Sequence, residues 1–132
     1  MSYLGNAFKE AEENDSFRKV IFTGKNSQLV LMSVPRGEEV GEETHPRVEQ
    51  SLFFLSGKGK AVLNGEETPI SEGSVVIVTP GTKHNFVNTG NEPLKILTIY
   101  SPPNHIDGRI HRTKKEAEED LEDERFGENI GG

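Results

Sequence analysis

A histidine in an acidic stretch is the first residue of the sequence whose surroundings suit a metal ligand. Residues 37–59 read GEEVGEETHPRVEQSLFFLSGKG, with His45 just ahead of a hydrophobic run. In extended backbone, residues two apart face the same side, so Glu43 and His45 point together and Thr44 points away. A register slip of one residue would bring Glu42 to the histidine instead. Two interpretations stay open: a surface histidine of a hairpin, or part of a metal site.

A second histidine lies far downstream, in the segment GSVVIVTPGTKHNFVN at residues 73–88. Apolar residues alternate along its first half, and Pro80 and Gly81 then turn the chain. His84 opens the next short apolar run. His45 and His84 thus each lie near the start of a predicted strand among polar neighbours, and two such histidines can converge inside a barrel.

Short apolar runs, each bounded by turn residues, would position these side chains. They are rich in Val, Ile, Leu and Phe, which is typical of strands. Asn64–Gly65 is a strong hairpin signal, because both central positions of that turn need positive φ. Runs spaced in this way indicate an all-β antiparallel sandwich or barrel. The runs cover residues 19–23, 28–34, 51–56, 60–63, 74–79, 85–88 and 94–100.

Short helices are predicted at both ends of the chain. Over residues 4–13, Leu4, Phe8 and Ala11 share one helical face. Near the other end, Thr113 and Glu116 form a capping box ahead of the weakly amphipathic run KKEAEEDLEDER. We expect this second helix to be solvated and its end frayed, in preference to an interaction tail.

Composition narrows the class of protein. The chain has 132 residues, the size of one domain, and a net charge of −7. Three basic and eight acidic residues follow residue 112, so the body is near neutral. Without a basic patch we expect no nucleic acid partner. The absence of cysteine excludes disulfides and thiolate chemistry. The chain shows no signal-peptide pattern and no apolar run of membrane-spanning length, so we expect a cytoplasmic protein with no membrane partner.

The two histidine segments resemble, in order, the two motifs of the cupin family. The first motif runs Gly, five residues, His-x-His, three or four residues, Glu, six residues, Gly. The second runs Gly, five residues, Pro-x-Gly, two residues, His, three residues, Asn. The resemblance covers roughly residues 20–100, and two independent spacing patterns agree in it. The matching residues are Gly37, Glu43, His45, Gln50 and Gly57 in the first motif and Gly73, Thr79, Pro80, Gly81, His84 and Asn88 in the second.

The resemblance implies an all-β double-stranded β-helix, or jelly-roll barrel, at residues 19–103. Residues 1–18 and 104–132 would then be extensions with short helices. The GEE-x-GEE-x-H stretch and a Gln in the Glu position are similar to those of many small bacterial cupins. Family members are often dimers, so we expect a homodimer, and exposed sheet edges favour one.

The resemblance also implies a metal site. The family's four ligand positions fall on Glu43, His45, Gln50 and His84. Glu43 replaces the usual first His and Gln50 replaces the usual Glu, and the two exchanges offset each other in charge. Two imidazoles, a carboxylate and an amide oxygen suit Fe, Mn, Ni or Zn better than Ca.

Other residues near the predicted site have two interpretations each. Glu49 is the alternative ligand to Gln50 if the strand is shifted by one residue from the predicted register. Arg47 is either a surface charge, the commoner case, or reaches an anionic ligand at the barrel mouth. His105 and His111 lie beyond the predicted strands and are expected to be free loop histidines, although a role in covering the site stays open.

The predicted function is that of a metal-dependent enzyme acting on a small organic substrate. In a dioxygenase, Fe(II) held by His45, His84 and Glu43 would leave open positions for substrate and O₂. In a sugar isomerase or epimerase, the metal would act as a Lewis acid and Glu49 is the candidate base. The alternative is a non-catalytic module that binds a metal or metabolite. An empty structural barrel is the least expected, since it would bury polar groups without compensation.

Overall fold

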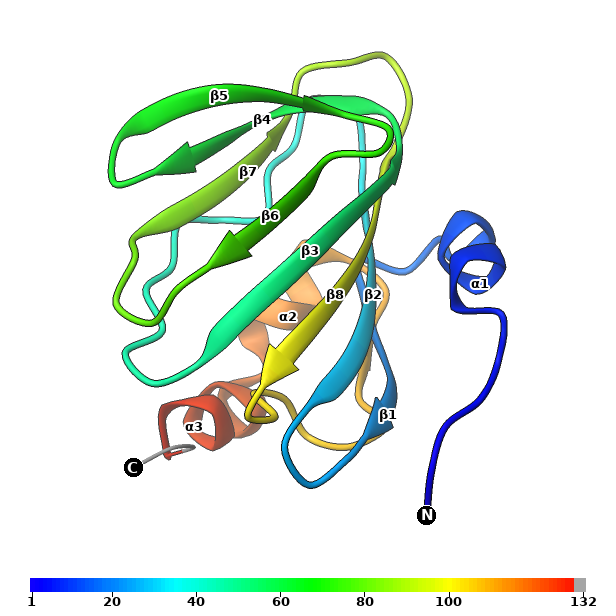
Figure 1. Ribbon diagram of the computed structural model, residues 1–132, viewed down its shortest axis with the longest axis vertical. Coiled ribbons are helices and arrows are strands. Elements are labelled where there is room, and N and C mark those ends of the chain that lie inside the picture. Colours follow the sequence, from blue (N-terminus) through cyan, green and yellow to red (C-terminus); the bar gives the residue numbers. More distant parts are fainter. Residues whose placement is uncertain (130–132) are drawn as a thin grey trace.

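The structure of the protein, a computed structural model, describes residues 1–129 and shows a barrel of two antiparallel sheets with small helices at both ends (Figure 1). The jelly-roll prediction is confirmed. The elements are α1 (Ala7–Glu13), β1 (Arg18–Thr23), β2 (Gln28–Val34), β3 (Glu49–Ser56), β4 (Lys58–Leu63), β5 (Glu66–Ser71), β6 (Val75–Val78), β7 (His84–Asn88), β8 (Leu94–Ser101), β9 (Ile110–His111), α2 (Lys114–Glu119) and α3 (Leu121–Asn129).

The strands of the barrel form two antiparallel sheets. The larger sheet runs β6-β3-β8-β2-β1-β9 and the smaller runs β5-β4-β7. Between them lies one apolar core that includes Phe54, Phe86, Met32 and Ile96, all with 0–1% of their surface exposed. The period-two alternation of β3 and β7 sends one side of each strand into this core. Polar residues on the same inner faces therefore have to be paired or bound to a ligand.

The predicted strands all form, and two more appear. The Asn64–Gly65 turn is confirmed, with φ of +49° and +85°, and it joins β4 to β5. β5 was missed because Glu66, Glu67 and Pro69 make its sequence read as a loop, although an edge strand tolerates proline. β9 was missed because it has only two residues, and it pairs with β1.

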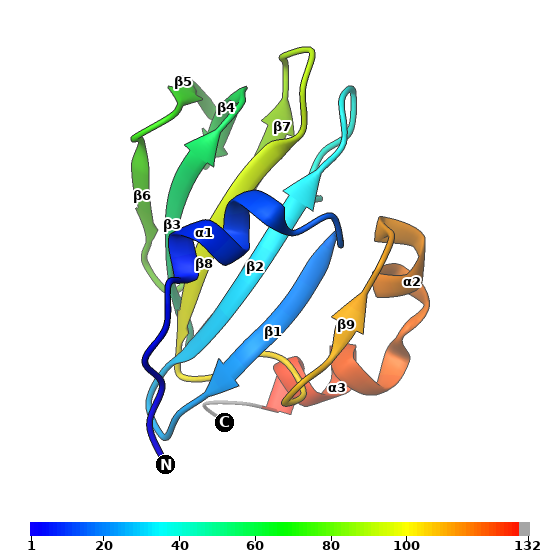
Figure 2. The same ribbon diagram turned by 90° about the vertical axis from the view of Figure 1, so that its right-hand side faces the viewer.

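The terminal helices differ from the prediction. α1 lies on the outer face of the larger sheet (Figure 2) and buries Ala11, but Leu4 and Phe8 are 98% and 57% exposed. The single acidic helix predicted after Thr113 is divided at Asp120 into α2 and α3. It is not simply a solvated helix, because α3 buries Asp123 against the barrel. The predicted frayed end lies partly at residues 130–132, outside the described residues.

No helix within residues 1–129 is long and apolar enough to cross a membrane.

Candidate metal centre

Two segments distant in sequence are joined by backbone hydrogen bonds at the candidate site. Glu43 and His84 form an isolated antiparallel bridge, in which each N–H donates to the other's C=O at 2.9 Å. A further bond, 2.8 Å long, runs from Gly81 N–H to the carbonyl of His45. Gly81 occupies the turn before β7 with φ of +84°, a conformation that other residues rarely adopt. These bonds fix the two histidine segments relative to each other before any ligand binds.

The side chains of Glu43, His45 and His84 meet as a result. One ligand atom from each lies within 4.8 Å of the others. The rings of His45 and His84 are 5.2 Å apart between centroids and tilted by 48°. His45 Nε2 lies 3.0 Å from Glu43 Oε2. Within the described chain this nitrogen nevertheless has no hydrogen bond of good geometry, and it is buried. The arrangement thus leaves a polar atom for which a bound cation would provide a partner.

The structure shows that Glu43, and not Glu42, is on the same side of the chain as the two histidines. Glu42 is exposed and its carboxylate lies 3.6 Å from Lys83 Nζ at the surface. Glu43 instead points to the two histidines. Burial by itself raises the pKa of Glu43, but the close approach of His45 and the charge of Arg18 outweigh it and bring the pKa down to about 2. Glu43 is therefore an anion at neutral pH.

His84 is held in the tautomer that a metal ligand needs. Its Nδ1 lies 2.9 Å from the carbonyl oxygen of Thr82, so the Nδ1–H donates there and Nε2 keeps its lone pair. The side chain is 3% exposed, and burial lowers the pKa of His84 in spite of this hydrogen bond. A neutral imidazole with one nitrogen fixed by a carbonyl is the usual form of a metal-binding histidine.

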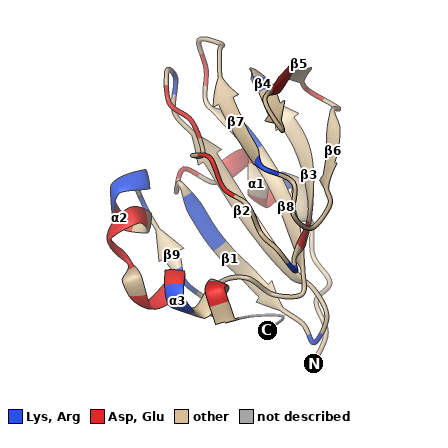
Figure 3. Cartoon of the chain, turned by 90° about the vertical axis from the view of Figure 1, so that its left-hand side faces the viewer, with Lys and Arg blue, Asp and Glu red and all other residues tan. Residues whose placement is uncertain are grey.

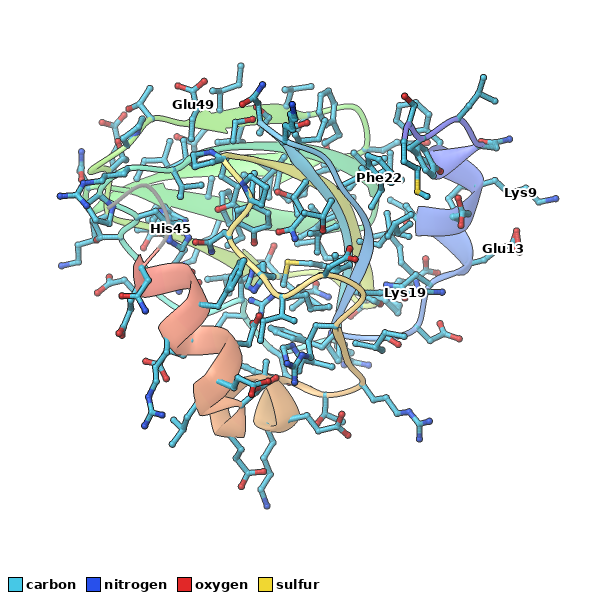
Figure 4. All side chains as sticks on the ribbon, turned by 90° about the horizontal axis from the view of Figure 1, so that it is seen from below. Lys9, Glu13, Lys19, Phe22, His45 and Glu49 are labelled. Atoms are coloured by element: carbon cyan, nitrogen blue, oxygen red, sulfur yellow. The ribbon has the colours of Figure 1, made fainter. Side chains whose placement is uncertain are left out.

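Gln50 lies on the inner face of β3, whereas Glu49 lies on the outer face. Gln50 is 3% exposed and donates its Nε2–H to Thr98 Oγ1 at 3.1 Å. Its Oε1 is buried with no partner among the described residues. Glu49 is exposed, and Figure 4 shows it at the rim of the molecule, away from His45. The register therefore favours Gln50 over Glu49 as a ligand. Glu49 lies outside the site, so its position does not support a role as the catalytic base.

The donor set fits a divalent transition metal. It offers a carboxylate oxygen from Glu43 and an imidazole nitrogen each from His45 and His84, and the unpartnered amide oxygen of Gln50 is a candidate fourth donor. Two buried atoms of this set, His45 Nε2 and Gln50 Oε1, lack protein partners within residues 1–129. Mixed nitrogen and oxygen donors suit Fe, Mn, Ni or Zn.

A cavity of about 520 Å³ opens onto this centre. Glu43 and His45 line it, together with residues of α2 and α3, the two helices that Figure 1 shows beside the lower end of the barrel. Arg47, which is exposed, is also among the residues that line it. Arg18 and His105 also line it. Arg18 was not predicted from the sequence, because it lies outside both motifs.

The expectation that His105 and His111 are free loop histidines is wrong. They are 7% and 3% exposed, and each pairs with an acid of the C-terminal helices. His105 Nδ1 lies 2.7 Å from Asp123 Oδ2, and His111 Nε2 lies 2.9 Å from Asp120 Oδ2. The acids come from a run that reads as a solvated face, so the sequence carried no sign of these pairs.

Metal affinity is expected to fall as the pH drops, because protonated imidazoles cannot bind a cation. Burial lowers the pKa of His84, so its protonation begins only below the usual value of ~6.5. As His84 protonates below that value, the affinity should decline by up to about tenfold per pH unit. Competition with a metal-sensitive dye between pH 8 and pH 5 measures this. An affinity that rises as the pH falls would contradict histidine ligands.

A sequence comparison identifies a family. A model described as the cupin domain matches residues 30–100. The uncharacterized protein YrkC of Bacillus subtilis is 40% identical over 122 residues, which cover 87% of this chain and 65% of YrkC, so this chain spans less than two thirds of that relative. A Thermotoga maritima protein named oxalate-binding protein is 34% identical over 90 residues, covering 68% of this chain and 74% of that protein.

Solved structures share the fold. The crystal structure of BH2720 from Bacillus halodurans matches with a TM-score of 0.88 and 34% identity, covering 89% of this chain and 94% of that one. A Thermotoga maritima protein described as a predicted oxalate decarboxylase matches with a TM-score of 0.57 and 30% identity, covering 60% of this chain and 69% of that one. The match to BH2720 extends well beyond residues 30–100, so the similarity includes parts of the extensions.

Proposed function

The chain belongs to the cupin family, and we propose that it binds one divalent transition-metal ion through Glu43, His45, His84 and Gln50 and acts as a metal-dependent enzyme on a small organic substrate. The single observation that carries the proposal is the convergence of Glu43, His45 and His84 within 4.8 Å beside an open cavity. A metal ion held there would act as a Lewis acid on an oxygen of the substrate.

The chain's own residues would do the remaining work. Glu43 balances part of the cation's charge, because it stays ionised. Thr82 and Thr98 orient His84 and Gln50 through the two hydrogen bonds described above. The apolar barrel core, which includes Phe54 and Phe86, excludes water from the side of the site that faces the barrel interior. Solvent and substrate would therefore reach the site through the cavity.

A non-catalytic role is the second candidate. The relative named oxalate-binding protein is named for binding rather than for a reaction. Glu49, the base considered from sequence, is on the outer face of β3. A module that binds a metal together with a small acid would use the same cavity and the same ligands.

Metal content and turnover separate these functions. Elemental analysis of untagged protein is expected to find about one Fe, Mn, Ni or Zn per chain. Oxygen uptake by the iron form with catechols, thiols and diketones tests a dioxygenase, and exchange of solvent deuterium into sugar phosphates tests an isomerase. A metal-loaded protein that binds small acids but is inactive throughout these panels would favour the binding module. A protein that takes up none of these metals would contradict both.

A matched pair of glutamates tests the carboxylate ligand. Glu43→Gln should weaken zinc binding by about tenfold to a hundredfold, because a neutral amide replaces the anionic ligand. Glu42→Gln removes the same charge one residue away, on the exposed face, and should leave zinc affinity within about twofold. Competition with a zinc-sensitive dye gives both values. Equal affinities for the two variants would rule out Glu43 as a ligand.

A further inference from the structure

A buried arginine without a carboxylate partner lines the inner part of the cavity. Arg18, on β1, is 6% exposed. No carboxylate among the described residues lies within ion-pairing distance of its guanidinium, and its Nε has no hydrogen-bond partner there. Its aromatic neighbour Phe17 contributes only a cation–π contact at 5.4 Å. The charge of Arg18 acts on the nearby carboxylates of Glu43 and Asp123, but neither forms an ion pair with it, so its unpartnered Nε is available to a carboxylate from outside the chain.

A histidine with one free nitrogen lines the same cavity. His105 donates Nδ1–H to the ionised Asp123 Oδ2 at 2.7 Å. Burial raises the pKa of Asp123, but the hydrogen bonds from His105 and from the Ile106 amide outweigh this effect and leave the pKa below its usual value. The other nitrogen, Nε2, is then a bare acceptor in the neutral ring, and it is buried with no partner within residues 1–129. The ring packs edge-on against Tyr100 at 4.9 Å, which fixes its plane.

The backbone that carries this histidine is held rigidly. Gln28, 1% exposed on β2, accepts hydrogen bonds from the amides of Asn104 and His105 at 3.1 and 2.9 Å. It also donates to the carbonyl of His105 at 2.7 Å. Arg18, Gln28, His105 and Asp123 all lie outside residues 30–100, the part that the cupin domain matches. The polar part of the cavity formed by Arg18, His105 and Asp123 thus comes from segments outside the matched domain.

We propose that this cavity binds a small hydroxylated carboxylate, with Arg18 pairing with the carboxylate and His105 Nε2 accepting a hydrogen bond from a hydroxyl group of the same molecule. The inference rests on the proposed function, because it names the substrate class of that site. A volume of about 520 Å³ exceeds the needs of a two-carbon acid and suits a ligand of sugar-acid size. Glu43 and His45 line the cavity too, so the ligand would reach the metal centre.

Charges at the entrance do not oppose this ligand strongly. Glu118, Glu124 and Glu128 line the outer part of the cavity, as do Arg47 and Lys114. Figure 3 shows acidic and basic residues side by side on α2 and α3 and a basic segment on β1. The three acids are exposed, so solvent and salt screen them, whereas Arg18 is buried and screened little. Deeper in the cavity Arg18 faces the ionised Glu43 and Asp123, so a cation bound at Glu43 would strengthen the binding of a carboxylate at Arg18.

Three six-carbon probes separate the two contacts. Gluconate carries both a carboxylate and hydroxyl groups, sorbitol lacks the carboxylate and hexanoate lacks the hydroxyls. Calorimetric titration of the full chain, in metal-free and zinc-loaded form, should show gluconate binding at least tenfold more tightly than either of the others. His105→Asn keeps a donor for Asp123 and removes the Nε2 acceptor, so it should weaken gluconate binding about tenfold. Arg18→Lys should weaken gluconate about tenfold, and Arg18→Gln more.

The outcomes distinguish this proposal from the function on which it rests. If gluconate binds no better than sorbitol in both forms, Arg18 is not a carboxylate site and the proposal is overturned. The proposal also fails if His105→Asn and Arg18→Lys, both folded by circular dichroism, bind gluconate as the parent protein does. Zinc affinity, measured separately, should change less than about threefold in His105→Asn. If the protein binds gluconate but no metal, only the proposed metal-dependent function is contradicted.

Discussion

His84→Ala is expected to reduce zinc affinity by more than about a hundredfold, the largest effect of any single substitution in the site. His84 is bonded to Glu43 through the backbone and supplies a lone pair fixed by Thr82. Its loss leaves two strong ligands and an amide, too few to hold the cation. Gln50→Ala should weaken binding less, since a neutral amide oxygen is the weakest of the four ligands. Dye competition and elemental analysis after gel filtration measure both.

His111→Ala is the matched control for His84→Ala. Both histidines are 3% exposed, but His111 pairs with Asp120 away from the cluster. Its replacement should destabilise the protein to a similar degree while leaving zinc affinity unchanged. Full zinc occupancy in both His84→Ala and Gln50→Ala would contradict the proposed ligand set.

Gln28→Ala is expected to destabilise the metal-free protein by about 3 kcal/mol, because it leaves three buried backbone groups of the 104–105 segment without partners. For a chain of this size the melting temperature should fall by roughly 10 °C. The loss should be local in origin: hydrogen exchange of the amides at Asn104 and His105 should accelerate more than that of the barrel core. Thermal unfolding and exchange mass spectrometry measure the two effects.

The control is the other glutamine of the chain. Gln50 is similarly buried on a barrel strand, but within residues 1–129 its side chain makes only one hydrogen bond, to Thr98. Gln50→Ala in the metal-free protein should therefore cost about 1 kcal/mol. If the two alanine variants unfold at the same temperature, Gln28 does not anchor the C-terminal segment as described.

The barrel itself was predictable, because its signals are local. Short apolar runs and turns such as Asn64–Gly65 indicate strands wherever they occur, and the spacing of the two motifs resembled one family. Strand β5 was not predicted, because its residues are mostly polar and exposed at the edge of the smaller sheet and so do not form an apolar run. The faces of Leu4 and Phe8 were mispredicted because a helical stripe does not reveal which sheet, if any, will cover it.

The site was predictable only where it follows strand periodicity. The two-residue spacing of Glu43 and His45 indicates that they share a face, and the structure brings both to His84. Arg18, His105 and Asp123 meet through long-range packing of a first strand and a C-terminal helix, and no short pattern records such contacts. The acidic run that contains Asp123 reads as solvated, although one of its residues is 4% exposed.

The central claim, a metal ion between the two motifs, is tested most directly by an anomalous-scattering crystal structure of the zinc-loaded protein. The peak should lie about 2.0–2.1 Å from one nitrogen each of His45 and His84 and about 2.0–2.2 Å from the Glu43 carboxylate. A peak elsewhere on the chain, with the two imidazoles uncoordinated at full zinc occupancy, would contradict it.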